Sequence, residues 1–172
     1  MPMLQGLPPI AGSQSRVLIL GSMPGAASLQ AGQYYAHTQN RFWRYMGALV
    51  GAHPDLPYLQ RVQQLGEAGV AVWDVIASCR REGSLDSAIR DEAVNDFNEF
   101  LARNPGVATV LFNGAKAESS FIRRALPSLA TSAPVLKRLP STSPANASQS
   151  DAMKLAAWRS ALIQAGARVI GD

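Results

Sequence analysis

The stretch "RVLILG", residues 16 to 21, decides the fold expected for this chain. It is a short run of branched apolar residues ended by a glycine. Such a run is typical of a strand that is buried on both faces of a parallel sheet. Three comparable runs follow, namely "GVAVWDV" (69–75), "VATVLFNG" (107–114) and "APVLKRL" (133–139). The sequence therefore predicts four buried strands.

Helical patterns separate these runs. Apolar residues recur at helical spacing in five segments, which are residues 40–51, 55–69, 94–101, 117–122 and 155–162. Strands that alternate with helices pair in parallel through right-handed crossovers. We therefore expect an α/β fold, a three-layer α/β/α sandwich with a central four-stranded parallel sheet, as a single domain over residues 1–172. Residues 81–92 are the longest polar connection and predict a surface loop with a helical turn.

Composition excludes several classes of site. Cys79 is the single cysteine, so disulfides within the chain and cysteine-ligated zinc or iron–sulfur clusters are excluded. With two histidines a metal site is not expected, and no cofactor is expected either. The net charge of +4 permits a polyanionic partner such as DNA without requiring one. No secretory signal or membrane-spanning apolar run is visible, so we expect a cytoplasmic protein that does not contact a membrane.

Polar segments follow each predicted strand. They are "GSMPGAAS" (21–28), "WDVIASC" (73–79), "FNG" (112–114) and "LPSTSPAN" (139–146). In open parallel sheets, ligands bind beyond the carboxyl ends of the strands. The four segments should therefore converge on the functional edge of the sheet.

The segment "GSMPGAAS" matches neither the dinucleotide-binding glycine pattern nor the P-loop, so a nucleotide cofactor is weakly supported. Ser22 could serve as a nucleophile only if His37 or His53 supplied its base. The Gly-x-Ser-x-Gly pattern is absent, which makes a serine hydrolase a minor alternative. A tight turn at the end of a strand is the simplest interpretation.

The segment "QYYAHTQNRFW" (33–43) gathers aromatic and amide side chains just before a predicted helix. Aromatic faces beside amide groups suit a pocket that stacks a flat heterocycle and reads its edge. A helix cap at Asn40 and a core role for Trp43 are the structural alternatives, and we favour the core role for Trp43. Asp74 and Asn113 end apolar strands, where a loop cap and a site role are equally open.

The segment "LPSTSPAN" combines small hydroxyl residues with two prolines. Such a loop can approach a phosphate backbone closely and bind it through N–H and O–H groups without reading the base sequence. The adjacent Lys137-Arg138 pair is the basic pair that we expect to bind phosphate. An ordinary turn followed by a helix cap is the alternative.

Five segments together resemble the deoxyinosine, or hypoxanthine, DNA glycosylase branch of the uracil-DNA glycosylase superfamily. They are "LILGSMPGAASL", "QYYAHTQNRFW", "GVAVWDVIASCRREGSLDSAI", "VLFNGAKA" and "LPSTSPAN". They occur in order along nearly the whole chain. The resemblance implies an enzyme that extrudes a deaminated base from DNA and hydrolyses its N-glycosidic bond. We expect monofunctional action, because a lyase step would need an amine nucleophile and Lys137 is the only lysine near the predicted site, where a phosphate contact is the preferred role. The iron–sulfur branches use four cysteines and are excluded.

The resemblance also suggests roles for individual residues. Asn40 is the catalytic candidate, which orients water, and Asp74 is its rival. The expected base-binding residues are Phe42 for stacking, with Tyr34, Tyr35, Asn113, Ser22, Met23, Pro24 and Gly25. The expected DNA-binding residues are Pro140, Ser141, Thr142, Ser143, Asn146, Lys137 and Arg138. Other branches carry a water-holding Asn or Asp-Pro in the first motif, which the segment 21–25 lacks, so efficient uracil excision is not expected.

Other functions stay open at this stage. The same fold could act on uracil or xanthine, or bind DNA or a nucleotide without turnover. The expected partner is DNA that contains a deaminated base, and the expected state is a monomer. The sequence does not decide between single-stranded and double-stranded DNA, or between Asn40 and Asp74 as the group that positions water.

Overall fold

The four predicted strands form one parallel sheet in the computed structural model, which describes residues 1–130, 132–145 and 148–171. They are β2 (Val17–Gly21), β3 (Val70–Asp74), β6 (Thr109–Asn113) and β7 (Val135–Leu139). Their order across the sheet is β3-β2-β6-β7, and all three pairings are parallel. Every residue of β2 is buried, as its unbroken apolar run predicts.

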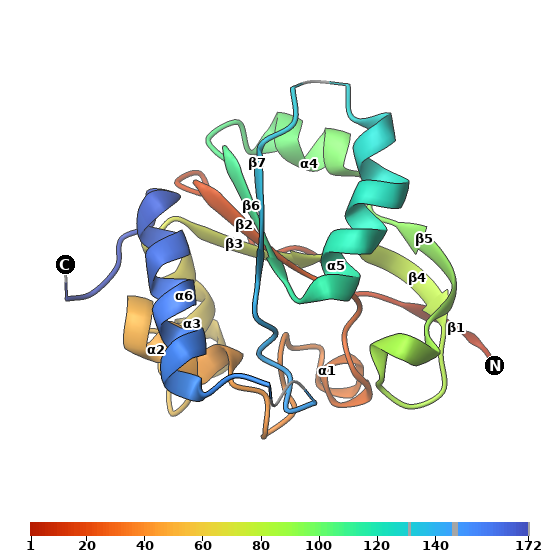
Figure 1. The fold of residues 1–172 in the computed structure, drawn as a ribbon, viewed down its shortest axis with the longest axis horizontal. Helices are drawn as coiled ribbons and strands as arrows, with labels where there is room; N and C mark the ends of the chain where they lie inside the picture. Colours follow the sequence, from red (N-terminus) through yellow and green to blue (C-terminus); the bar gives the residue numbers. More distant parts are fainter. Residues whose placement is uncertain (131, 146–147, 172) are drawn as a thin grey trace.

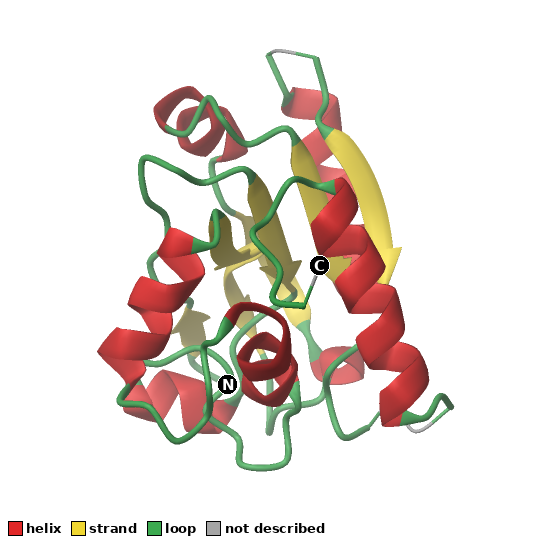
Figure 2. Ribbon diagram, turned by 90° about the vertical axis from the view of Figure 1, so that its left-hand side faces the viewer, coloured by secondary structure: helices red, strands yellow, loops and turns green. Residues whose placement is uncertain are grey.

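Helices cover both faces of this sheet (Figure 1). One face carries α2 (Phe42–Val50), α3 (Tyr58–Glu67) and α6 (Asp151–Gln164), and the other carries α4 (Phe97–Arg103), α5 (Ala115–Ser120) and the π-helical turn η2 (Phe121–Ala125). Figure 2 shows the layer of α2, α3 and α6 from the front, with the strands behind it. Alternate residues of β2 face opposite layers, with Val17 and Ile19 in one core and Leu18 and Leu20 in the other. The expected α/β/α sandwich is confirmed.

A second sheet was not anticipated. It is antiparallel, in the order β1-β4-β5, and consists of β1 (Met3–Gln5), β4 (Ile76–Arg80) and β5 (Arg90–Val94). The helical turn expected within residues 81–92 is present as η1 (Asp86–Ala88), but the end of that segment belongs to β5. Met23 packs against Ile76, Cys79 and Ile89, so this sheet supports the turn that follows β2.

The short helix α1 (Ala26–Ala31) follows β2 at the carboxyl edge of the parallel sheet, at the bottom of Figure 1. It ends at Gly32, whose φ of 65° is readily adopted by glycine. The remaining element is the 3₁₀ turn η3 (Leu126–Ser128). Within the described ranges, no helix has the length and apolar character needed to cross a membrane.

Candidate active site

A pocket of about 920 Å³ opens at the carboxyl ends of the parallel strands. Segments from all four predicted polar connections line it, as expected for this edge of the sheet. Two further segments complete the wall, residues 34–40 before α2 and residues 84–87 at η1. The pocket therefore gathers residues that are far apart in the sequence.

The inner end of the pocket is built around the missing side chain of Gly21. Gly21 and Asp74 are partners across β2 and β3. A Cβ atom at Gly21 would lie 2.5 Å from Asp74 Oδ1 and 2.9 Å from the Tyr35 hydroxyl. Tyr35 has a φ of 53°, a left-handed conformation that non-glycine residues rarely adopt. Gly21 thus leaves the space in which a carboxyl and a phenol meet.

Asp74 and Tyr35 are both perturbed by this environment. Burial, reinforced by the nearby Asp86 carboxylate and opposed by Arg81, raises the pKa of Asp74 to about 7. Burial, reinforced by the Asp74 charge, raises the pKa of Tyr35 above its ordinary value. The phenol therefore keeps its proton at neutral pH, while the Asp74 carboxyl is divided between its two protonation states.

Asn40 faces the same pocket from the segment before α2. Its Oδ1 accepts a hydrogen bond from the Phe42 N–H at 2.9 Å, so it also supports the start of the helix. Among the described residues, Asn40 Nδ2 makes no hydrogen bond. Asn40 therefore combines the capping role with an amide group that is available to a ligand.

Phe42 does not reach the pocket. It is fully buried, and its ring stacks on Tyr35 with centroids 4.0 Å apart and an interplanar angle of 19°. Tyr35 lines the pocket and Phe42 supports it from the core, so Phe42 is not placed to make the stacking contact expected of it. Trp43 is buried, as favoured from the sequence.

Tyr34 also lines the pocket, but its hydroxyl group points elsewhere. The hydroxyl contacts the carbonyl oxygens of Leu7 at 3.1 Å and Pro8 at 2.8 Å in the N-terminal segment. Tyr34 itself is buried. Its hydroxyl therefore anchors the chain before β2, and only the rest of the residue contributes to the pocket wall.

Asn113 is committed to hydrogen bonds within the protein. Its Oδ1 accepts from the Thr142 N–H at 2.9 Å, and its Nδ2 donates to Thr142 Oγ1 at 2.9 Å and to the Tyr35 hydroxyl at 3.2 Å. Both amide protons are used, so the base contact expected of Asn113 would require it to break one of these bonds. In this structure Asn113 fixes the loop after β7 and the Tyr35 ring.

The residues expected to bind DNA divide into three groups. Four of them line the pocket beside Arg138, namely Pro140, Ser141, Thr142 and Ser143, although Thr142 is fully buried. Lys137 is exposed on β7 but does not line the pocket. Asn146 lies outside the described residues. The structure thus brings Arg138 to the pocket and leaves Lys137 away from it.

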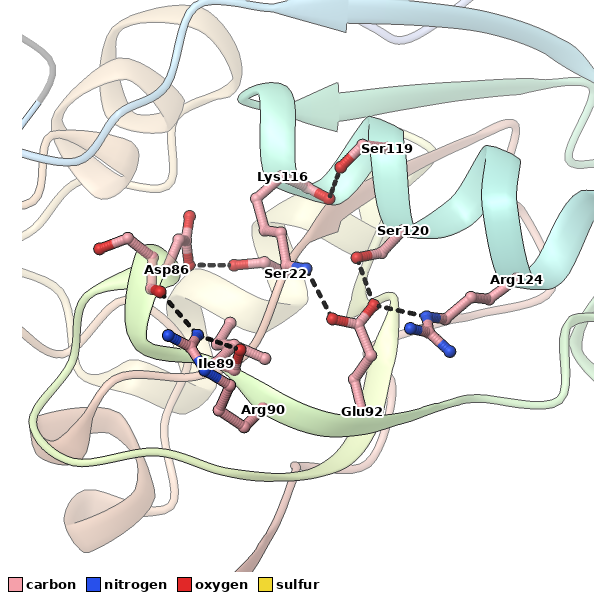
Figure 3. Close-up of polar contacts among 10 residues, drawn as sticks. Ser22, Asp86, Ile89, Arg90, Glu92, Lys116, Ser119, Ser120 and Arg124 are labelled. Atoms are coloured by element: carbon pink, nitrogen blue, oxygen red, sulfur yellow. Dashed lines mark hydrogen bonds and ion pairs between the residues drawn. The ribbon is translucent and has the colours of Figure 1, made fainter.

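Lys116 is a pocket residue that the sequence analysis did not select. It lies in the first turn of α5, and its Nζ bonds Glu92 Oε2 at 2.6 Å (Figure 3). Glu92 also accepts from Ser120 at 2.6 Å and pairs with Arg124 at 3.2 Å. The only available signal was its position three residues after Asn113.

The turn after β2 is held by the segment 81–86. Ser22, Met23, Pro24 and Gly25 all line the pocket, as expected. The Ser22 hydroxyl donates to Asp86 Oδ1 at 2.6 Å (Figure 3), and Arg81 Nη2 donates to the Pro24 carbonyl at 2.6 Å. The hydrogen-bond acceptor for Ser22 is a carboxylate and not a histidine, which weighs against the serine-hydrolase alternative. Asp86 and Arg81 were missed because residues 81–92 were interpreted as a surface loop.

The model of the uracil DNA glycosylase superfamily matches residues 8–165, which include every segment of the pocket. The chain belongs to the uracil DNA glycosylase superfamily. This membership confirms the resemblance inferred from the five segments.

Two curated relatives of this chain carry the name hypoxanthine DNA glycosylase. The protein of Methanosarcina barkeri is 39% identical over 114 residues, which cover 66% of this chain and 72% of the relative. The protein of Methanosarcina acetivorans is 37% identical over the same shares of the two chains.

A solved structure supports the fold of the superfamily. It is a solution NMR structure of a candidate uracil DNA glycosylase from Methanosarcina acetivorans, 31% identical to this chain with a TM-score of 0.77. The match covers 95% of this chain and 99% of the solved one. The parallel sheet and its helical layers are therefore those of this superfamily.

Proposed function

We propose that this protein is a monofunctional DNA glycosylase that hydrolyses the N-glycosidic bond of hypoxanthine in DNA. The observation that carries the proposal is the convergence of Asn40, Asp74 and Tyr35 on one pocket at the carboxyl edge of the sheet. The names of the two curated relatives support the choice of hypoxanthine among deaminated bases.

The pocket suits a base that has been turned out of the DNA stack. At about 920 Å³ it has room for a purine nucleoside together with a water molecule. Extruding a base costs a few kcal/mol, and less when the base is damaged or mispaired. Because inosine pairs more weakly than a normal nucleoside, hypoxanthine enters such a pocket at lower cost.

Asn40 positions the attacking water in this proposal. An amide does not titrate near neutral pH, so Asn40 orients the water and does not remove its proton. We infer a dissociative reaction in which the C1′–N9 bond breaks first and leaves an oxocarbenium-like sugar. Fixed orientation of the water and hydrogen bonds to the departing base together lower the barrier by several kcal/mol.

Recognition of hypoxanthine follows from its donor and acceptor groups. Its O6 and N7 atoms accept hydrogen bonds, and the Tyr35 hydroxyl is a donor that faces the pocket. Adenine carries an amino group in place of O6 and would leave such a donor unpaired. An unpaired buried donor costs about 1–3 kcal/mol, which disfavours adenine.

The DNA backbone is expected to contact the rim of the pocket. Ser141 and Ser143 are partly accessible there, and Arg138 and Lys116 supply positive charge. The buried Thr142 holds the loop in place instead of contacting phosphate. We also propose that residues 1–172 act as one domain and as a monomer, because segments of one chain make up the pocket wall.

Release of free base from defined oligonucleotides tests this function. Duplex and single-stranded oligonucleotides would carry one hypoxanthine, xanthine or uracil, with adenine and guanine as controls, and the products would be analysed by mass spectrometry. We expect hypoxanthine release to be fastest. Release of mainly uracil or xanthine would retain the enzyme class and change the base, whereas DNA binding with no base released would favour the binding-module alternative.

A further inference from the structure

The side chain of Asp74 is buried at the pocket without the bonds of a loop cap. It is 4% exposed, and its Oδ2 has no hydrogen-bond partner among the described residues. The amide two residues on, which a capping aspartate would bind, is used elsewhere, because Ile76 N–H donates to Ser22 O. A loop-capping role therefore does not account for this carboxyl.

Asp74 forms no ion pair within the described part of the chain. The nearby Arg81 donates instead to the carbonyl oxygens of Pro24 and Gly83. The other groups that act on Asp74 are the phenols of Tyr34 and Tyr35 and the carboxylate of Asp86. A buried carboxyl that has no ion-pair partner and lies beside a like charge favours its uncharged form, and the opposing effect of Arg81 is the smaller one.

Two basic side chains also line the pocket, and each is paired with a carboxylate other than Asp74. Lys116 is paired with Glu92, and Arg138 with Glu118. His37 also lines the pocket, and its Nδ1 accepts from the Gln39 N–H. The pKa of Asp74, raised to about 7 mainly by burial, agrees with this arrangement. Burial therefore favours the protonated form of Asp74 near neutral pH, where an ordinary aspartate is ionised.

We propose that Asp74 enters the reaction as a carboxylic acid that donates its proton to the departing purine, while Asn40 orients the water. This assignment rests on the proposed function. Asp74 and Asn40 were both candidates for positioning the water. In this assignment Asp74 acts on the purine and Asn40 on the water. Both face the one pocket, and only Asp74 can supply a proton.

The step balances without another reactant. The C1′–N9 bond breaks and its electron pair passes to the purine, which takes the Asp74 proton and leaves as a neutral base. Water adds to C1′ and releases one proton, which restores the carboxyl group of Asp74. General acid catalysis of this kind contributes about 10²-fold to 10⁴-fold to a rate.

Single-turnover excision of hypoxanthine from about pH 5 to about pH 9 tests the proposal in wild type, Asp74→Asn and Asp74→Ala. The wild-type rate constant should fall as the pH rises through about 7, because the acid form is lost. Asp74→Asn can donate a hydrogen bond but cannot transfer a proton, so its rate should be at least about 10²-fold lower and should not show this fall. Asp55→Asn, an exposed aspartate that does not line the pocket, should keep the wild-type profile.

A wild-type rate that rises through this pH range, or an Asp74→Asn profile equal to the wild-type profile, would overturn the assignment of Asp74 alone. No hypoxanthine release by the wild type at any pH would overturn the proposed function together with it. NMR titration of the Asp74 carboxyl carbon in wild-type protein provides a readout that needs neither turnover nor a variant. A carboxyl that stays ionised down to about pH 5 would contradict the proposal.

Discussion

The amide of Asn113 binds Thr142 at two points. Asn113 Oδ1 accepts from the Thr142 N–H, and Asn113 Nδ2 donates to Thr142 Oγ1, each at 2.9 Å. The same Nδ2 reaches the Tyr35 hydroxyl at 3.2 Å. One side chain at the end of β6 thereby sets the position of the loop after β7 and of the aromatic ring in the pocket.

Asn113→Ala should loosen this loop. The substitution removes three hydrogen bonds and leaves buried groups of Thr142 unpaired, which should lower the free energy of unfolding by about 1–3 kcal/mol. The affinity for hypoxanthine-containing DNA should fall as well. Urea unfolding and fluorescence anisotropy measure the two effects. Asn98→Ala removes similar amide bonds, to Ser128 and Ala130, away from the pocket and should leave DNA affinity unchanged. Wild-type DNA affinity in Asn113→Ala would contradict the role of Asn113 in positioning the loop after β7.

Gly21→Ala should displace Asp74 and Tyr35. The new Cβ would lie 2.5 Å from Asp74 Oδ1 and 2.9 Å from the Tyr35 hydroxyl. Crowding of this kind costs about 1–3 kcal/mol of stability and should also slow excision. Gly66→Ala is the control, because its Cβ meets nothing within 4 Å and alanine favours the helix α3. Unaltered stability and excision in Gly21→Ala would show that the close approach is unimportant.

Arg138→Gln and Lys137→Gln should differ in the salt dependence of DNA binding. Arg138 lines the pocket, whereas its exposed neighbour Lys137 does not. Each lost phosphate contact reduces the slope of log affinity against log salt by about 0.9 for duplex DNA. We expect this reduction for Arg138→Gln and a smaller one for Lys137→Gln. The opposite order, measured by salt titration, would contradict the placement of Arg138 at the DNA and favour Lys137 of the predicted pair.

Asp74→Asn should stabilise the protein at alkaline pH. The pKa of Asp74 in the folded state is about 7, above the ordinary value of 3.8. A raised folded-state pKa contributes stability that is complete below the unfolded-state pKa and is lost as the pH rises through the folded-state pKa. The free energy of unfolding of the wild type should therefore decline relative to that of Asp74→Asn between about pH 4 and about pH 7. Urea unfolding across this range measures the difference, and parallel curves for the two proteins would contradict it.

The parallel sheet could be predicted from the sequence because each of its strands is a continuous apolar run. The second sheet could not be predicted, because its strand Arg90–Val94 is largely exposed and shows no regular alternation of polar and apolar residues. The other edge strand of this sheet, β1, has three residues and pairs with β4, where Met3 lies opposite Arg80, a contact that no local pattern reveals. The consequence was the interpretation of residues 81–92 as a loop, which concealed Asp86 and Arg81.

The pocket edge and most of its lining could be predicted because parallel strands deliver their ends to one side. The roles of neighbouring aromatic residues could not. The sequence predicted both Tyr35 and Phe42 as aromatic residues of the pocket. In the structure Tyr35 has a positive φ, and its ring lies between Phe42 and Gly21. Likewise, Asn113 meets its partner Thr142 only through the tertiary fold. The sequence therefore could not show whether Asn113 binds the loop after β7 or the base.

The central claim is that Asn40 orients the water that releases hypoxanthine, and single-turnover excision by wild type, Asn40→Ala and Asn40→Asp tests it most directly. Asn40→Asp retains an oxygen for the Phe42 N–H, so it separates loss of this capping bond, worth about 1 kcal/mol, from loss of the amide. We expect the wild type to release hypoxanthine. Asn40→Ala should bind DNA with an affinity close to wild type but excise hypoxanthine at a rate at least about 10²-fold lower. A wild-type rate of excision in Asn40→Ala would contradict the central claim.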